Sequence, residues 1–239
     1  MQKHKLFALS QIQLGFFPDY CRMSIVNIFE ESAGPVAASL LNIGAIKLNY
    51  EKPFTWSSGW KSPIYCDNRL ALSYPAIRTE IKKFLTDAVR QYFPNNQSIA
   101  GVATAGIAQG ALVADALNLP YLYVRPKPKE HGMGNLIEGK VEPGQRVVLV
   151  EDLISTGGSS LKSAEALRDA GFIVEGMVAI FTYGFDTAVK NFESNKVSLV
   201  CLSDFEHLLP EAIKMNYIKQ EDLENVKKWR NDPAGWGKI

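Results

Sequence analysis

RVVLVEDLISTGGSSLKSAEAL, residues 146–167, combines an apolar run, a pair of acids and a loop of small residues. The run at 146–150 predicts a buried strand, and the apolar spacing over 158–170 predicts a helix. Glu151 and Asp152 stand side by side where that strand is expected to end. A strand, a short polar loop and a helix in this order are typical of one unit of a parallel sheet covered by helices.

The same alternation continues along most of the chain. Strands are predicted at 45–48, 99–103, 121–124, 146–150 and 173–181. Helices are predicted within 24–49 ahead of the first strand, and at 74–93, 107–117 and 158–170. The apolar face of the 74–93 helix consists of Ile77, Ile81, Phe84, Leu85, Ala88 and Val89. The fold class is therefore α/β, a central, mostly parallel sheet flanked by helices. Ligands of such sheets bind outside the carboxyl ends of the strands, so chemistry is expected after residues 103, 124 and 150.

Size and composition limit the classes of function. The 239 residues are 46% hydrophobic, enough for a single globular domain with its own core. The 26 Lys and Arg balance 25 Asp and Glu, so no charge bias points to nucleic acid or an anionic membrane. Three cysteines without C-x-x-C spacing argue against a disulfide framework or zinc site and favour a reducing compartment, the cytoplasm: Cys21, Cys66 and Cys201.

Two apolar segments need a separate interpretation. Residues 99–117 are long enough to span a bilayer, but Gln109 and Asp115 interrupt them, so a strand, loop and helix is the better prediction. The N-terminal segment lacks a continuous apolar run and a small-residue cleavage site, which argues against a signal peptide. Because a normal domain start follows Met23, residues 1–22 are a possible extension of a single domain at 23–239.

The loop after the acid pair has the properties of a phosphate site. Gly and hydroxyl residues that open a helix present unpaired N–H groups and the positive end of the helix dipole. No Lys follows the glycines and no G-x-G-x-x-G is present, so the common nucleotide motifs are absent. Ionised carboxylates accept hydrogen bonds from neighbouring hydroxyls such as those of ribose. The pattern predicts a ribose 5-phosphate ligand; the alternative is a pair of helix-capping or solvated acids.

The motif VVLVEDLISTGGS, residues 147–159, resembles the phosphoribosyl pyrophosphate signature of type I phosphoribosyltransferases. The resemblance implies that fold, with a hood of largely N-terminal elements over about 23–70, a core over about 71–205 and a helical tail over about 206–239. It implies that the acids hold the ribose hydroxyls, with Asp152 catalytic, and that the loop holds the 5′-phosphate. The implied donor-binding residues in this stretch are Glu151, Asp152, Leu153, Ile154, Ser155, Thr156, Gly157, Gly158 and Ser159.

A basic loop, YVRPKPKEHGMGNLIEG at 123–139, has the composition of a lid. Its prolines forbid a regular helix and its glycines permit hinge motion. Fixed cations would stabilise a departing pyrophosphate, and closure would exclude water; the alternative is a solvated basic loop. The pattern resembles the catalytic loop of orotate phosphoribosyltransferases, which reaches into the neighbouring subunit's site. It implies pyrophosphate contacts from Arg125, Lys129 and His131, the last two catalytic; Lys127 is the nearest substitute for a Lys that many members carry at Pro126.

Two further loops complete the expected site. FTWSSGWKSPIYCDNR, residues 54–69, predicts a hairpin and resembles the N-terminal hairpin of the orotate enzymes, with Ser57 where others carry Lys. Lys61, Tyr65 and Arg69 are all candidates to face orotate, whereas Trp56, Trp60 and Tyr65 could equally be core. The resemblance assigns an orotate contact to Ser155. Residues 103–106 are expected to bind pyrophosphate through the backbone, with Gly106 allowing close approach, and tight packing is the alternative for Gly110 and Ala111.

The resemblance implies an orotate phosphoribosyltransferase of pyrimidine (UMP) biosynthesis, which makes orotidine 5′-phosphate and pyrophosphate. It implies Mg²⁺ bound mainly through the substrate, with no protein metal ligands, and a homodimer that shares the 125–139 loop across its interface. Two alternatives remain at this point. One is a transferase for a purine or another base, and the other is a non-enzymatic regulator that senses phosphoribosyl pyrophosphate and binds nucleic acid.

Overall fold

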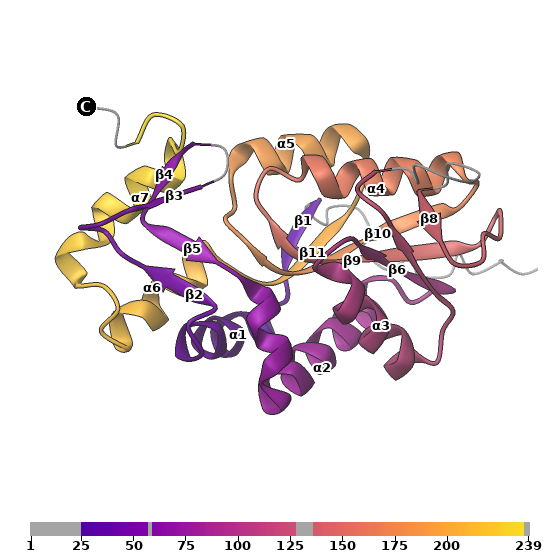
Figure 1. The fold of residues 1–239 in the computed structure, drawn as a ribbon, viewed down its shortest axis with the longest axis horizontal. Helices are drawn as coiled ribbons and strands as arrows, with labels where there is room; N and C mark the ends of the chain where they lie inside the picture. The colour runs from indigo at the N-terminus through magenta and orange to yellow at the C-terminus, as the bar shows by residue number, and fades with distance from the viewer. Residues whose placement is uncertain (1–24, 57–58, 128–135, 237–239) are drawn as a thin grey trace, which may run out of the picture.

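The computed structural model describes residues 25–56, 59–127 and 136–236. Its centre is a seven-stranded sheet in the order β1-β11-β10-β9-β6-β7-β8 (Figure 1). All neighbouring pairs are parallel except β7 and β8. The strands are β1 (Val26–Ile28), β6 (Ser98–Val102), β7 (Tyr121–Val124), β8 (Ile137–Glu138), β9 (Arg146–Ile154), β10 (Ile173–Thr182) and β11 (Leu199–Asp204).

Helices cover both faces of this sheet because successive side chains of each buried strand point to opposite faces. Val148 and Val150 of β9 join the core beneath α1, α2 and α3, whereas Val147 and Leu149 join the core beneath α4 and α5. Figure 1 shows the two helical layers on opposite sides of the sheet. The helices are α1 (Glu30–Asn42), α2 (Pro75–Tyr92), α3 (Gly106–Leu117), α4 (Gly158–Asp169), α5 (Asp186–Asn195), α6 (Phe205–Lys214) and α7 (Leu223–Asn231), with 3-10 turns η1 (Asn68–Ser73) and η2 (Gln220–Asp222).

The predicted α/β class and most predicted elements are confirmed. The 99–117 segment is a strand and a helix, and among the described residues no helix combines the length and apolar character needed to cross a membrane. The apolar face predicted for 74–93 is a face of α2, and it packs against the main hydrophobic core. Residues 1–22 lie outside the described residues.

Two boundaries differ from prediction because strand pairing overrides the local pattern. Residues 26–28, expected to be helical, form β1, which pairs with β11 and is fixed by a 2.7 Å bond from the Leu199 N–H to the Ile25 carbonyl. Strand β9 does not end at 150. It continues to Ile154 because β10 pairs with it as far as Thr182. The first four residues of the expected loop therefore belong to the strand.

Short antiparallel strands in the N-terminal third form the hood. β2 (Ile46–Leu48) pairs with β5 (Ile64–Cys66), and β3 (Phe54–Thr55) pairs with β4 (Lys61–Ser62). The β3–β4 hairpin was predicted, although its turn residues 57–58 lie outside the described residues. The buried Asn68 side chain donates from Nδ2 to the Asp152 carbonyl at 2.7 Å, so the hood is tied to the end of β9.

The C-terminal helix α7 anchors an aromatic cluster that joins the hood to the sheet. Trp229 is fully buried, and its ring centroid lies 5.5–5.7 Å from those of Trp56, Tyr183, Phe185 and Phe205. Edge-to-face contacts of this kind add to the free energy of burying the rings. Helix α7 lies beside β3 and β4 in Figure 1, and Trp229 joins it to the hood through Trp56.

We expect Trp229→Ala to lower the free energy of unfolding by about 3–5 kcal/mol, because it opens a cavity among four packed rings. Chemical denaturation monitored by circular dichroism measures the change. Lys228→Ala, at an exposed position on the same helix, is the control and should shift stability by about 0.5 kcal/mol or less. Equal effects of the two substitutions would show that the cluster does not support the hood.

Candidate active site

In a sheet of this topology, a ligand crevice is expected at the carboxyl edge between β6 and β9. The chain passes from β6 to β7 on one side and from β9 to β10 on the other, which makes this pair the topological switch point. Pairing of β6 with β9 ends at Gly101 and Val150, whereas β10 accompanies β9 to Ile154. The last four residues of β9, beginning with the acid pair, therefore border the crevice.

Of the two acids of this pair, Glu151 is almost removed from water and Asp152 is half-buried. Glu151 is 6% exposed, and its carboxyl group accepts a 2.9 Å bond from Ser160 Oγ and a 3.0 Å bond from the Asp152 N–H. Burial, and then the nearby Asp152 charge, raise the pKa of Glu151 to about 8. Burial also raises the pKa of Asp152, but a hydrogen bond from Glu151 and the charge of Arg69 oppose that shift. At neutral pH Glu151 therefore retains its proton, whereas Arg69 and the hydrogen bond with Glu151 favour the ionised form of Asp152.

The loop that follows the acid pair turns directly into α4. Gly157 adopts φ 79°, and a side chain there would meet the Phe192 ring 2.6 Å from its Cβ, so glycine is required on both counts. The Leu161 N–H is bonded to the Gly157 carbonyl, which leaves the N–H groups of the first helical turn pointing out of the helix. Gly158 and Ser159 are exposed. The loop thus offers backbone donors and a dipole to an anion.

A cavity of about 600 Å³ opens beside this loop. Three residues of the predicted donor-binding stretch line it: Leu153, Ser155 and Thr156. The remaining wall residues are Thr55, Trp56, Trp60, Tyr65, Cys66 and Tyr183. The structure therefore brings the hood hairpin and the 153–156 segment together around one space, whereas Ile154 itself is fully buried in the core.

Of the three candidate base contacts in the hood, one lines the cavity and two do not. Tyr65 lines the cavity. Lys61 lies outside its wall and donates to Thr55 Oγ1 at 2.8 Å, and Arg69 is held by Asp67 through a 2.6 Å ion pair. Trp56 and Trp60, for which a core role was the alternative, are both half-buried and line the cavity.

The described part of the predicted lid lies at the neighbouring strand end. Arg125 directly follows β7 and pairs with Glu138 at 3.2 Å. Lys127 is exposed. Lys129 and His131, to which the resemblance assigns catalytic roles, lie outside the described residues.

The 103–106 loop joins β6 to α3 across the crevice. A side chain at Gly106 would collide with the Val150 carbonyl, so this glycine allows α3 to pack closely on β9. A Cβ at Gly110 would lie 3.1 Å from Gly101 Cα, in agreement with tight packing, whereas Ala111 is exposed. Thr104 is exposed at the tip of the loop.

Sequence reasoning missed three residues of this site. Ser160 lies one position beyond the predicted loop, and its bond to Glu151 depends on the first turn of α4. Asn68 acts through a contact with Asp152, 84 residues away in sequence. Tyr183 follows β10, another parallel strand, and the rule that places ligands at carboxyl ends would have indicated the loop after 181.

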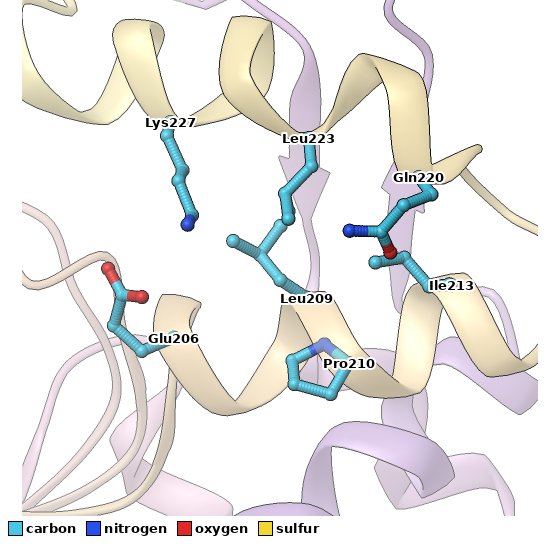
Figure 2. A pocket seen from close by; sticks show the side chains of 7 residues that line it. All are labelled: Glu206, Leu209, Pro210, Ile213, Gln220, Leu223 and Lys227. Atoms are coloured by element: carbon cyan, nitrogen blue, oxygen red, sulfur yellow. The ribbon is translucent and has the colours of Figure 1, made fainter.

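A second hollow, of about 450 Å³, lies between α6 and α7 (Figure 2). Its lining residues are Glu206, Leu209, Pro210, Ile213, Gln220, Leu223 and Lys227. Leu209 and Leu223 point toward each other, and Glu206 and Lys227 lie at one end. None of the predicted site residues lines this hollow, so the cavity beside β9 is the better active-site candidate.

The family comparison agrees with this geometry. Residues 72–206 match the phosphoribosyl transferase domain, and with the acid pair and anion loop this match defines the class of protein as a phosphoribosyltransferase. Proteins named orotate phosphoribosyltransferase from Cytophaga hutchinsonii and Listeria monocytogenes are 56% and 51% identical to the chain over 203 residues, 85% of this chain and 97% of each relative. A solved orotate phosphoribosyltransferase of Aeropyrum pernix gives a TM-score of 0.64 at 29% identity, covering 77% of this chain and 99% of that one. The chain belongs to the orotate phosphoribosyltransferase family, which confirms the resemblance and the predicted fold class.

We expect Glu151→Gln to change how stability depends on pH. Because its pKa is raised to about 8 from 4.5, wild-type Glu151 holds a proton in the folded state that the unfolded chain loses, so folding stability falls as pH rises between these values. The cost is on the order of 1.4 kcal/mol per pKa unit. Glutamine carries no such cost, so the variant should gain stability over wild type between pH 5 and 9, as measured by denaturation.

Glu165→Gln, at an exposed position on α4, is the matched control for that experiment. Its free energy of unfolding should not differ from that of the wild type in a way that depends on pH. A stability difference between Glu151→Gln and wild type that stays constant with pH would show that Glu151 is ionised in the free enzyme.

Proposed function

We propose that the cavity beside β9 is where this enzyme transfers ribose 5-phosphate from phosphoribosyl pyrophosphate to orotate, giving orotidine 5′-phosphate and pyrophosphate in UMP biosynthesis. The observation that carries the proposal is the junction of two sites. The first site consists of the acid pair and the N-terminus of α4. The second is the aromatic cavity, and Ser155 and Thr156 belong both to its wall and to the loop of the first site. A sugar phosphate on the first would direct its C1 toward a planar base in the second.

The donor's phosphate and sugar would occupy the end of β9. The free N–H groups from Gly158 onward suit the 5′-phosphate, and the exposed Ser159 adds a hydroxyl. Ionised Asp152 accepts from a ribose hydroxyl, whereas protonated Glu151 can both donate and accept. The negative Asp152 also lies where a ribosyl centre with oxocarbenium character would gain positive charge, and a fixed charge placed there lowers the barrier.

The base would lie in the cavity, with its ring between aromatic side chains. Trp56 and Tyr65 supply flat apolar surface from the hood. Ser155, to which the resemblance assigns an orotate contact, lines the same space. The N1 atom of orotate would attack C1 as the bond to pyrophosphate breaks, so the base needs one edge at the acid-pair end of the cavity.

The leaving pyrophosphate gains negative charge and needs cations. Arg125 lies at the end of β7, on the same edge of the sheet as the acid pair. We assign Lys129 and His131 to the same task, with Lys127 as the nearest substitute for the Lys that many family members carry at Pro126. Exposed Thr104 and the backbone of residues 103–106 face the edge at which the pyrophosphate would leave.

Magnesium fits this site as a companion of the substrate. In the described ranges no three His, Cys, Asp or Glu side chains converge on one point, which is compatible with an ion held mainly by the substrate. Mg²⁺ commonly takes one or two carboxylates together with phosphate oxygens and water. Asp152 is the charged carboxylate available to it, and when bound the ion would neutralise phosphate charge.

A homodimer in the cytoplasm is the proposed working form. The family pattern of the 125–139 loop supports a lid shared between subunits. The free thiols of Cys66 and Cys201 are compatible with a reducing compartment.

The direct test of the proposed function mixes the protein, Mg²⁺ and phosphoribosyl pyrophosphate with orotate, uracil, adenine or hypoxanthine. Release of pyrophosphate is followed in each case. Release with orotate alone is the expected result. Release with a purine but not orotate would support the alternative of a purine transferase, and release with none of the bases would favour the regulator.

We expect Lys129→Ala to lower turnover by about 10²–10³, because the departing pyrophosphate loses a cation that stabilises its developing charge. Orotate affinity should barely change, since the base binds elsewhere. Lys140→Ala, an exposed lysine just past the lid, is the control. Steady-state kinetics measure both, and full turnover of Lys129→Ala would remove the lid from the mechanism.

A shared lid predicts complementation between two inactive variants. When Lys129→Ala and Asp152→Asn chains exchange subunits, each hybrid dimer should contain one site with its own Asp152 and the partner's Lys129. Random mixing should restore about one quarter of wild-type activity, because half of the dimers are hybrid and half of their sites are complete. No recovery despite subunit exchange would mean that each lid closes on its own site.

A further inference from the structure

Tyr183 places a hydroxyl in the cavity wall directly after β10. Its side chain is 2% exposed, and it lines the cavity together with Ser155 and Cys66. The ring is held on several sides. Its centroid lies 5.0 Å from that of Trp56, 5.4 Å from that of Phe185 in a stacked arrangement and 5.6 Å from that of Trp229. A ring packed in this way has one position, so its hydroxyl is pre-organised.

The phenol O–H of Tyr183 can donate a hydrogen bond. No hydrogen bond joins it to any residue in the described part of the chain. Burial raises the pKa of Tyr183 well above 10, so the phenol stays protonated at physiological pH. It lines the cavity together with Leu153, the residue directly after the acid pair. Because its oxygen is not one of the fully buried, unpaired side-chain atoms of the described residues, the hydroxyl is open to the cavity, where a ligand can accept its hydrogen bond.

The remaining wall does not neutralise an anionic base. No lysine or arginine is among the described residues that line the cavity. Orotate carries a carboxylate on C6, next to the N1 atom that must reach C1 of the ribose. When N1 faces the acid pair, this carboxylate therefore lies at the same end of the cavity, close to the negative Asp152. A hydrogen bond from a fixed O–H group would offset that repulsion.

We propose that Tyr183 is a specificity-determining residue, whose hydroxyl donates a hydrogen bond to the C6 carboxylate of bound orotate. The inference rests on the proposed function, in which the cavity receives the base. It assigns selection of orotate over uracil, which lacks the carboxylate, to a neutral donor positioned by packing.

The test is Tyr183→Phe, which removes the hydroxyl and keeps the ring that the neighbouring aromatics contact. We expect the KM for orotate to rise about 10- to 100-fold, the range for a lost hydrogen bond to a charged group. The KM for phosphoribosyl pyrophosphate and the inhibition constant of uracil should stay within about twofold of wild type. Tyr74→Phe, which removes an exposed phenol at the start of α2, is the control.

Three results would overturn the assignment. One is an orotate KM for Tyr183→Phe within about twofold of wild type. Another is an equal loss of affinity for orotate and for uracil, which would show that the hydroxyl bonds to a group that both bases share. The third is a parallel rise in the KM for phosphoribosyl pyrophosphate, which would indicate general damage to the site. Wild-type enzyme that uses another base and not orotate would refute the proposed function itself, a separate outcome.

Discussion

Two neighbouring acids lie near the end of strand β9, Glu151 buried and Asp152 half-buried, and much of the site is arranged around them. Burying an unpaired charge there would cost several kcal/mol. The structure lowers that cost by leaving one proton on Glu151, which also accepts a bond from Ser160. Asn68 then binds the Asp152 carbonyl from the hood, so the position of the ionised acid is fixed from both sides.

This arrangement depends on the length of β9 relative to its neighbours. Because β6 stops pairing at Gly101 while β10 continues to Thr182, the acid end of β9 has a strand partner on one side only. Trp56 and Tyr183 line the cavity, and buried Trp229 packs against both of them from α7. The hood, the central sheet and α7 therefore share one aromatic cluster beside the cavity.

Much of this could be predicted from sequence. Short apolar runs that alternate with helical spacing identified the parallel sheet, and the 147–159 motif located the acid pair and its loop. The helix predicted over residues 26–28 was wrong. Val26 and Ile28 suit either structure, and only pairing with β11 makes them part of strand β1. The end of β9 was misplaced for the same reason, since it depends on the length of β10. Tyr183 was missed because its role requires the packing of residues far apart in the chain, which no local pattern shows.

The most direct measurement is difference electron density from a crystal of the enzyme grown with phosphoribosyl pyrophosphate and Mg²⁺. The account predicts the 5′-phosphate against the N–H groups at the start of α4, with the ribose hydroxyls on the carboxyl groups of Glu151 and Asp152. Sugar-phosphate density in the hollow between α6 and α7, or anywhere else while the end of β9 stays empty, would contradict it.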